Sequence, residues 1–165
     1  MVHILHVTED HSPANTGVTS AVEALARQVL PALNVSVLST GRESVPLPPG
    51  VRGTQLPIGG IGSAWRASPG GSEVLGKQIR QADVIHLHGA WMWVQATAAH
   101  LAWQERKPFL ISLHGMLEPW IWQRQHWAHQ LKKKVYWRLV AYPRFKHARL
   151  IHAIHPREAS HLNDY

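Results

Sequence analysis

Short apolar segments of strand length alternate with segments of helical periodicity along this chain, and this alternation restricts the fold more than any other feature. Residues 18–33 carry apolar side chains at i, i+3, i+4, i+7 and i+8, which predicts one amphipathic helix. Strand patterns lie at 3–9, 35–40, 83–89, 109–115 and 148–154, and further helix patterns lie at 73–81, 92–104 and 124–140. Such alternation is typical of parallel sheets. We expect an α/β fold, a doubly wound and mostly parallel sheet with helices on both faces.

The segment 41–71 interrupts this alternation. It holds eight of the 12 glycines and five of the 11 prolines of the chain. Glycine and proline are poorly tolerated inside helices and strands, and long segments rich in them are often loops that carry function. We therefore expect a long loop beside a site, with one short strand at 52–58.

The composition narrows the class of protein. The chain has 165 residues, 45% of them hydrophobic, which is enough for one domain with a core. Cysteine is absent, which leaves no disulfide, no thiolate metal site and no cysteine nucleophile. Residues 1–10 do not resemble a signal peptide, and no apolar run approaches the ~18 residues of a membrane span. Because the pattern stops inside a helix after residue 155, we expect residues 1–165 to be a single domain of a truncated or partial chain.

Two of the strand patterns end in the same tripeptide, Leu-His-Gly, at residues 87–89 and 113–115. In an open parallel sheet, ligands bind outside the carboxyl ends of the strands. Glycine at such an end allows a sharp turn and close approach of a ligand. We therefore expect His88 and His114 to lie side by side on the rim of one cleft, together with the turn at Asn15, Thr16 and Gly17 after the first strand.

Three interpretations of these histidines remain open. The first is that they only cap strands through backbone hydrogen bonds. The second is a zinc hydrolase, because His86 and His88 project from the same side of a strand, although no third ligand stands at motif spacing. The third is a polar organic ligand held by imidazoles and backbone amides. The turn before the helix at residue 18 favours the third, since a helix N-terminus offers free N–H groups to an anion.

The sequence LHGMLEPW at 113–120, preceded by DVIHLHGAW at 83–91, resembles bacterial glycosyltransferases of family 4. These are retaining enzymes with two facing Rossmann-like domains, the arrangement called GT-B. The resemblance covers essentially the whole chain, in the order of the N-terminal, acceptor-side domain. The HGMLEPW segment followed by a basic, Trp-rich helix is similar to a subgroup that builds cell-surface polysaccharides.

The resemblance implies a role for each matching residue. His114 would be catalytic, reaching a hydroxyl of the donor sugar. The residues that would bind substrate are Thr16, Gly17, Val18, His88, Gly89, Gly115 and Glu118. The nucleotide-sugar is a co-substrate held mainly by a C-terminal domain, and the acceptor is a glycan or a lipid-linked molecule. Neither a metal ion nor another cofactor is expected, and the isolated half should be inactive or nearly so.

The net charge of +7 is concentrated in one part of the chain. Eight of the 17 cations lie between residues 124 and 149, and no acid occurs from 123 to 157. The predicted helix 124–140 combines these cations with aromatic residues, which suits an anionic membrane surface. We expect its apolar stripe to pack inward and its cations to face lipid. The stripe is Trp127, Leu131, Val135 and Leu139, and the cations are Lys132, Lys133, Lys134 and Arg138.

These observations predict a cytoplasmic protein, soluble or peripheral at the inner face of the cell membrane. Nucleic acid also attracts basic and aromatic surfaces, but the chain has no recognised binding module and we do not expect such a partner. Two alternatives stay open beside the glycosyltransferase. One is the zinc hydrolase, and the other is a non-enzymatic basic domain that only binds membrane or nucleic acid.

Overall fold

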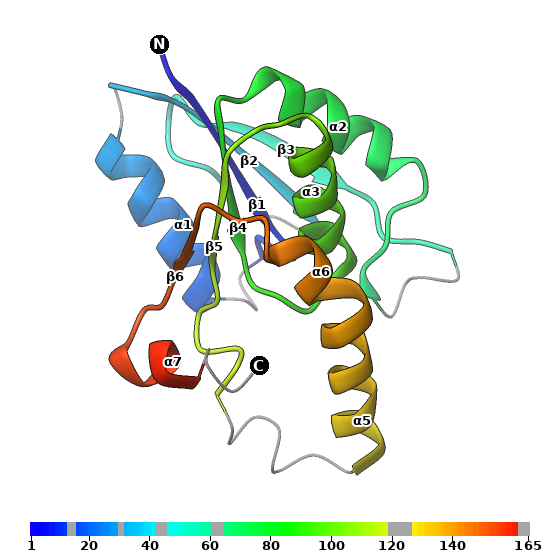
Figure 1. Cartoon of the computed structure of the whole chain (residues 1–165). Helices are drawn as coiled ribbons and strands as arrows, with labels where there is room; N and C mark the ends of the chain where they lie inside the picture. The colour runs from blue at the N-terminus through cyan, green and yellow to red at the C-terminus, as the bar shows by residue number, and fades with distance from the viewer. Residues whose placement is uncertain (13–15, 30–31, 42–45, 61–64, 119–126, 162–165) are drawn as a thin grey trace.

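The computed structural model describes residues 1–12, 16–29, 32–41, 46–60, 65–118 and 127–161 (Figure 1). Its strands are β1 (His3–Thr8), β2 (Asn34–Thr40), β3 (Arg52–Leu56), β4 (Val84–His88), β5 (Phe109–Ser112) and β6 (Leu150–His152). Its helices are α1 (Thr16–Val29), α2 (Gly71–Gln81), α3 (Trp93–Gln104), α5 (Trp127–Tyr136), the π-helical segment η2 (Trp137–Ala141), α6 (Tyr142–Phe145) and α7 (Pro156–His161). Each predicted element is present, with ends that differ by a few residues, whereas the π-helical segment η2 and the short helix α6 were not predicted.

The six strands form one parallel sheet in the order β3-β2-β1-β4-β5-β6. The order runs outward in one direction from β1 and in the other from β4, so the chain reverses direction across the sheet between these two strands. That is the point at which doubly wound folds bind ligands. The predicted fold class is confirmed, including a short strand, β3, within the glycine- and proline-rich segment.

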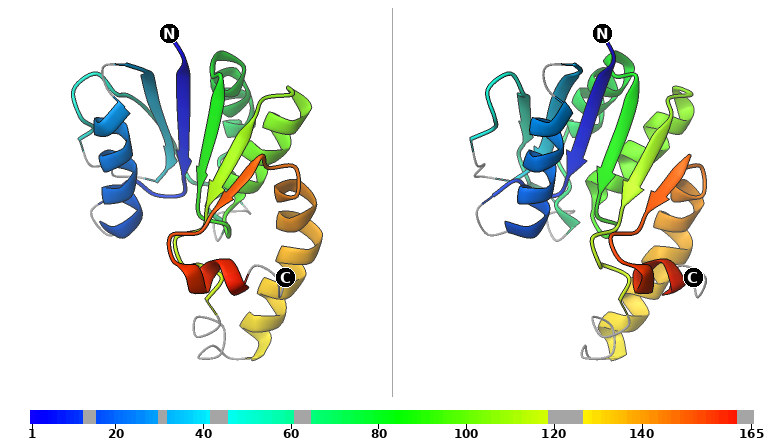
Figure 2. Two further views of the ribbon diagram at one scale, coloured as in Figure 1. Left: turned by 60° about the vertical axis from the view of Figure 1, so that its left-hand side comes forward. Right: turned by 90° about the vertical axis from the view of Figure 1, so that its left-hand side faces the viewer.

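Helices cover both faces of the sheet (Figures 1 and 2). On one face α1 packs Val18 and Val22 against Val37 of β2. On the other face α2 and α3 cover the main core, which contains the buried side chains of alternate strand positions. These are Leu5, Val7, Ile85, Leu87, Phe109 and Ile111. Burying each of these side chains stabilises the fold by roughly 1.5–3 kcal/mol, so this second face supplies most of the core.

The apolar stripe of α5 and η2 does not pack inward as the sequence predicts. Trp127, Leu131, Val135 and Leu139 are 68%, 54%, 47% and 68% exposed. The side chains that face the core are instead Tyr136, Ala141 and Phe145. Figure 1 shows the reason: α5 extends past the ends of the strands, so its first turns have no sheet to cover. Among the described residues, no helix is long and apolar enough to cross a bilayer.

Candidate functional site

Polar side chains from four neighbouring strands meet on the face of the sheet that α1 partly covers. The register pairs His6 of β1 with His86 of β4, and Ser112 of β5 with both His88 and His152 of its neighbours. Because alternate strand residues point to the same face, these five side chains share one side of the sheet. The row therefore follows from strand register, which joins residues far apart in the sequence.

Hydrogen bonds connect these side chains into two short chains. His6 Nδ1 lies 2.9 Å from His88 Nε2, and His88 Nδ1 lies 2.9 Å from His114 Nε2. In the second chain, Ser112 Oγ lies 2.7 Å from His86 Nε2 and 2.9 Å from His152 Nδ1. The first chain leads from the interior of the sheet to the end of β5, where His114 is half-buried. His88 and His114 thus lie side by side, as predicted, while their proximity to the turn at Gly17 stays a prediction.

Burial keeps the inner histidines neutral. It lowers the pKa of His6 to about 4 and, together with the neighbouring imidazoles, the pKa of His86 to about 3. The pKa of His88 falls well below its usual value for the same reasons. A neutral imidazole has one N–H and one lone pair, so His88 must donate one of its two hydrogen bonds and accept the other. The tautomer of His88 thus fixes the role that His114 Nε2 plays.

The backbone at His114 is held in an unusual conformation. Its φ is 54°, in the left-handed region, and Gly115 follows with a φ of 77°. A non-glycine residue there costs ~1 kcal/mol, so the turn needs support. The carboxylate of Glu158 in α7, which is 1% exposed, accepts hydrogen bonds from the N–H groups of Gly115 and Ile154. Sequence reasoning missed Glu158, whose only signal is that it is the first acid after residue 123.

The sequence predicts His88 on the rim of a cleft, but the structure places it in the interior. Its side chain is fully buried behind His114, with both ring nitrogens bonded to other histidines. Gly89 has a φ of 90°, and a Cβ there would lie 3.0 Å from Met116 Cε and 3.1 Å from Gln95 Nε2. Gln95 is buried and donates from Nε2 to the carbonyl of His88 at 2.8 Å. His88 and Gly89 therefore support the turn from within; their contact with substrate stays a prediction.

The remaining predicted residues lie around the same edge. Glu118 is half-buried, and its N–H donates to the carbonyl of Gly115 at 3.1 Å. Gly17 lies in the first turn of α1, and a Cβ there would meet nothing within 4 Å. The side chain of Val18 is 6% exposed and belongs to the core, which leaves its backbone for any contact with a ligand. Residues 13–15 and the Thr16 side chain lie outside the described residues.

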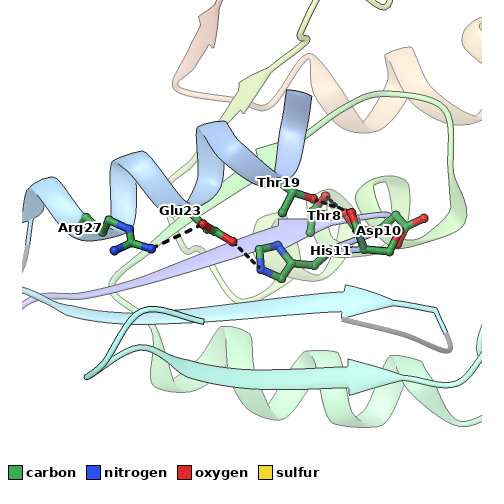
Figure 3. A network of polar contacts seen from close by, with 7 residues as sticks. Thr8, Asp10, His11, Thr19, Glu23 and Arg27 are labelled. Carbon is green, nitrogen blue, oxygen red and sulfur yellow. Dashed lines mark hydrogen bonds and ion pairs between the residues drawn. The ribbon is translucent and has the colours of Figure 1, made fainter. Parts of the chain in front are cut away.

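A polar network ties α1 to the loop that follows β1 (Figure 3). Thr19 Oγ1 donates to the carbonyl of Ser12 at 3.3 Å. Glu23 lies 3.8 Å from His11 Nε2 and 3.7 Å from Arg27 Nη2. These contacts hold the first turn of α1 close to the carboxyl end of β1, the position at which its N-terminus could face an anion.

Three buried imidazoles also qualify as a possible metal cluster. One ring nitrogen of each of His6, His86 and His88 lies within 4.8 Å of the others. His6 supplies the third ligand that spacing in the sequence did not reveal. Hydrogen bonds already use both nitrogens of His88, Nδ1 of His6 and Nε2 of His86, so an ion would have to displace some of them. The hydrogen-bonded network accounts for the cluster without an ion.

Two of the predicted membrane-facing lysines contact aromatic rings. Lys132 Nζ lies 4.7 Å from the centre of the Trp65 ring, and Lys133 Nζ lies 5.3 Å from that of Trp91. Such cation–π contacts stabilise a surface lysine by roughly 0.5–1 kcal/mol. Lys134 and Arg138 are exposed.

The parallel sheet in the order β3-β2-β1-β4-β5-β6, with polar groups at its carboxyl edge, defines a Rossmann-like α/β domain of the GT-B kind. The chain belongs to glycosyltransferase family 4, whose sequence model matches residues 15–165. No curated protein matches the sequence.

Solved structures share the fold. A protein from Listeria monocytogenes described as a UDP-N-acetylglucosamine 2-epimerase superposes with a TM-score of 0.59, at 11% identity, over 99% of this chain and 41% of its own. MurG from Acinetobacter baumannii superposes with a TM-score of 0.54, at 16% identity, over 96% of this chain and 42% of its own. At these identities the likeness establishes the fold alone. The chain spans about two fifths of the length of either structure.

Proposed function

We propose that this chain is the acceptor-side half of a retaining glycosyltransferase, which moves a sugar from a nucleotide-sugar to a glycan or lipid-linked acceptor in polysaccharide synthesis. The observation that carries the proposal is the half-buried His114, positioned at the carboxyl edge of the sheet by the bond to His88 and by the Glu158 support of Gly115. In this proposal a second half, outside residues 1–165, holds the nucleotide.

The residues of this half contribute orientation. His114 offers a hydrogen bond to a sugar hydroxyl, and its bond to His88 Nδ1 limits how the imidazole can turn. Holding a reactant in one geometry lowers the barrier because the entropy of alignment is lost before the reaction begins. The first turn of α1 and the open space at Gly17 suit the approach of a phosphate. The name of the Listeria protein, which refers to a nucleotide-sugar, is consistent with such a ligand on this fold.

We further propose that the protein works at the cytoplasmic face of the membrane, with α5 near anionic lipid and no nucleic acid as partner. The support is the exposed apolar stripe of α5 next to its lysines. A zinc hydrolase is the second candidate, because His6 provides a third imidazole beside His86 and His88. The hydrogen bonds within that cluster favour the glycosyltransferase.

The test replaces His114 by alanine in the protein that joins this chain to a nucleotide-binding half. Losing one hydrogen bond made in the transition state costs ~1–3 kcal/mol, so kcat/KM for sugar transfer should fall roughly tenfold to a hundredfold. His129→Ala, which removes an exposed imidazole from α5, is the matched control and should leave kcat/KM unchanged. Wild-type rates for His114→Ala at both limiting and saturating donor would refute the role of His114.

A further inference from the structure

A groove of about 960 Å³ lies between α3 and α5, with Trp65 and Ala67 of the segment before α2 also at its border. Helix α3 covers the face of the sheet opposite to α1 (Figure 2). Apolar side chains form most of its lining, among them Trp65, Trp93, Ala96, Leu131, Val135 and Val140. Its volume is in the range of small-molecule sites, which are mostly apolar with a few polar groups at defined places. The groove therefore has the size and the lining of a binding site for an apolar molecule.

The wall that α5 contributes is the stripe that the sequence predicted to be buried. Trp127, Leu131 and Val135 all line the groove and remain about half exposed or more. Leu139 lies on the same stripe but borders a different hollow, with Trp103 and His147. Contiguous exposed apolar surface of this kind marks a place where another molecule binds.

Cations lie at the groove, which Lys132 and Arg144 line, and beside the segment that follows His114. Lys132 lines the groove, with its Nζ over the ring of Trp65. Lys133 sits over the ring of Trp91, whose Nε1 donates to the carbonyl of Met116 at 3.1 Å, two residues after His114. Positive charge beside an apolar groove is complementary to a molecule with an anionic head and an apolar chain.

The groove begins near the carboxyl edge of the sheet. Trp93, Ala96 and Thr97 of its lining belong to the first turns of α3, directly after β4 and the His88-Gly89 turn. Its wall from α5 and η2 extends from Trp127 to Val140, which corresponds to ~20 Å of helix. The hydrocarbon of one bilayer leaflet is ~15 Å thick, so the groove is long enough for a single lipid chain.

We propose that this groove binds the hydrocarbon chain of a lipid phosphate and that Lys132 and Lys133 face the phosphate. The inference rests on the proposed function, whose lipid-linked acceptor it specifies: the chain lies between α3 and α5, and the head extends toward His114. A membrane surface and a single extracted lipid carry the same chemistry, and the experiment separates them.

The experiment measures binding of farnesyl phosphate to the 165-residue chain without vesicles, by calorimetry and tryptophan fluorescence. Saturable binding of one molecule per chain is expected. Leu131→Gln together with Val135→Gln should weaken it at least tenfold. Both positions are exposed, so the fold should survive. The matched control is Leu139→Gln, an exposed apolar residue of the same stripe outside the groove, which should leave affinity unchanged.

A second pair of variants tests the head group. Lys132→Gln should weaken binding of farnesyl phosphate several-fold and leave farnesol unaffected, whereas Lys146→Gln, which removes a cation from the neighbouring hollow, should change neither. Inorganic phosphate alone should bind far more weakly than farnesyl phosphate. Circular dichroism of each variant checks that the fold is retained.

Several outcomes would overturn the proposal. These are no saturable binding of farnesyl phosphate, an equal loss in Leu139→Gln, or binding to vesicles but never to the monomeric lipid. Concentration-dependent dimerisation that Leu131→Gln abolishes would assign the groove to a second copy of the chain. The proposed function fails separately. If His114→Ala loses sugar transfer and the chain binds no lipid, only the groove is refuted. If the chain binds lipid and His114→Ala keeps full activity, only the catalytic role is refuted.

Discussion

The sequence reveals some of the residues around His114 but not others. The repeated Leu-His-Gly ending made it possible to predict that His88 and His114 lie together, because both follow neighbouring strands. The participation of His6, Ser112 and His152 could not be predicted, since it requires the register of β1 against β4 and of β5 against β6. Register is set by contacts between distant segments, which local patterns do not contain.

The buried histidines make stability depend on pH in a defined direction. The pKa of His6 is about 4 in the folded chain, against an ordinary value of 6.5, so the unfolded chain binds the proton more tightly. The stabilisation by neutral His6 is therefore fully present above pH ~6.5 and is lost as the pH falls toward 4, by on the order of 3 kcal/mol. His86, with a pKa of about 3, acts in the same direction.

Urea unfolding between pH 7 and pH 4.5 measures this effect. The slope of the unfolding free energy against pH measures how many protons the chain takes up on unfolding. Because His6→Asn cannot titrate, this number should be lower by nearly one at pH 5 in the variant. Burial raises the pKa of Glu9, which stabilises the fold toward acid and opposes the histidines. Comparison of wild type with His6→Asn cancels that contribution. Equal slopes for the two proteins would mean that His6 does not stay neutral in the fold.

At the scale of elements, the periodicity of α5 predicts the helix but not the surface that its apolar side contacts. The i, i+4, i+8 spacing of Trp127, Leu131 and Val135 predicts a helix, and the helix is present. The spacing cannot tell whether the apolar side meets the core or the groove, because that depends on how far the helix extends past the sheet. A π-helical segment, η2, then shifts the register so that Ala141 and Phe145 face the core.

The lysines of α5 lead to a prediction about membranes. Each lysine near an anionic surface contributes on the order of 1 kcal/mol, so changing Lys132, Lys133 and Lys134 to glutamine should weaken binding to anionic vesicles well over tenfold. The loss should shrink as salt rises, and neutral vesicles should show little change. Vesicle co-sedimentation of the chain measures both.

The matched control for this triple variant changes Arg52, Lys77 and Arg106 to glutamine. It removes the same total charge from exposed positions outside α5, so it separates a local surface from general attraction. Equal weakening in both triple variants, or no binding by wild type at low salt, would show that α5 is an ordinary solvated helix.

For the whole molecule, the alternation of strand and helix patterns was sufficient to predict a parallel, doubly wound sheet, because each element carries its own local signal. The support of the His114 turn by Glu158 was not predictable. It brings together a carboxylate of α7 and a backbone N–H after β5, which are 43 residues apart. The same holds for the groove, whose lining joins residues of α3 and α5 with Trp65 and Ala67 of the segment before α2. Local patterns thus predict the fold, while tertiary contacts assemble the candidate site.

The zinc alternative also concerns the whole molecule, since its three ligands come from both sides of the chain reversal at β1 and β4. Tetrahedral zinc holds imidazole nitrogens at ~2.0–2.1 Å. His6 Nδ1 and His88 Nε2 instead bond directly to each other at 2.9 Å, and His88 Nδ1 is bonded to His114. Binding an ion would break this network among buried side chains, so we expect the chain to bind no zinc at the cluster.

Metal analysis of the chain, purified from zinc-supplemented medium and dialysed, should therefore find well under one zinc ion per molecule. Added zinc should not raise the melting temperature. The chain has 13 histidines, some of them exposed, so weak surface binding needs a control. Stoichiometric zinc that disappears in His86→Asn but remains in His129→Asn would place an ion in the cluster, and the hydrolase would then replace the glycosyltransferase as the better account of these histidines.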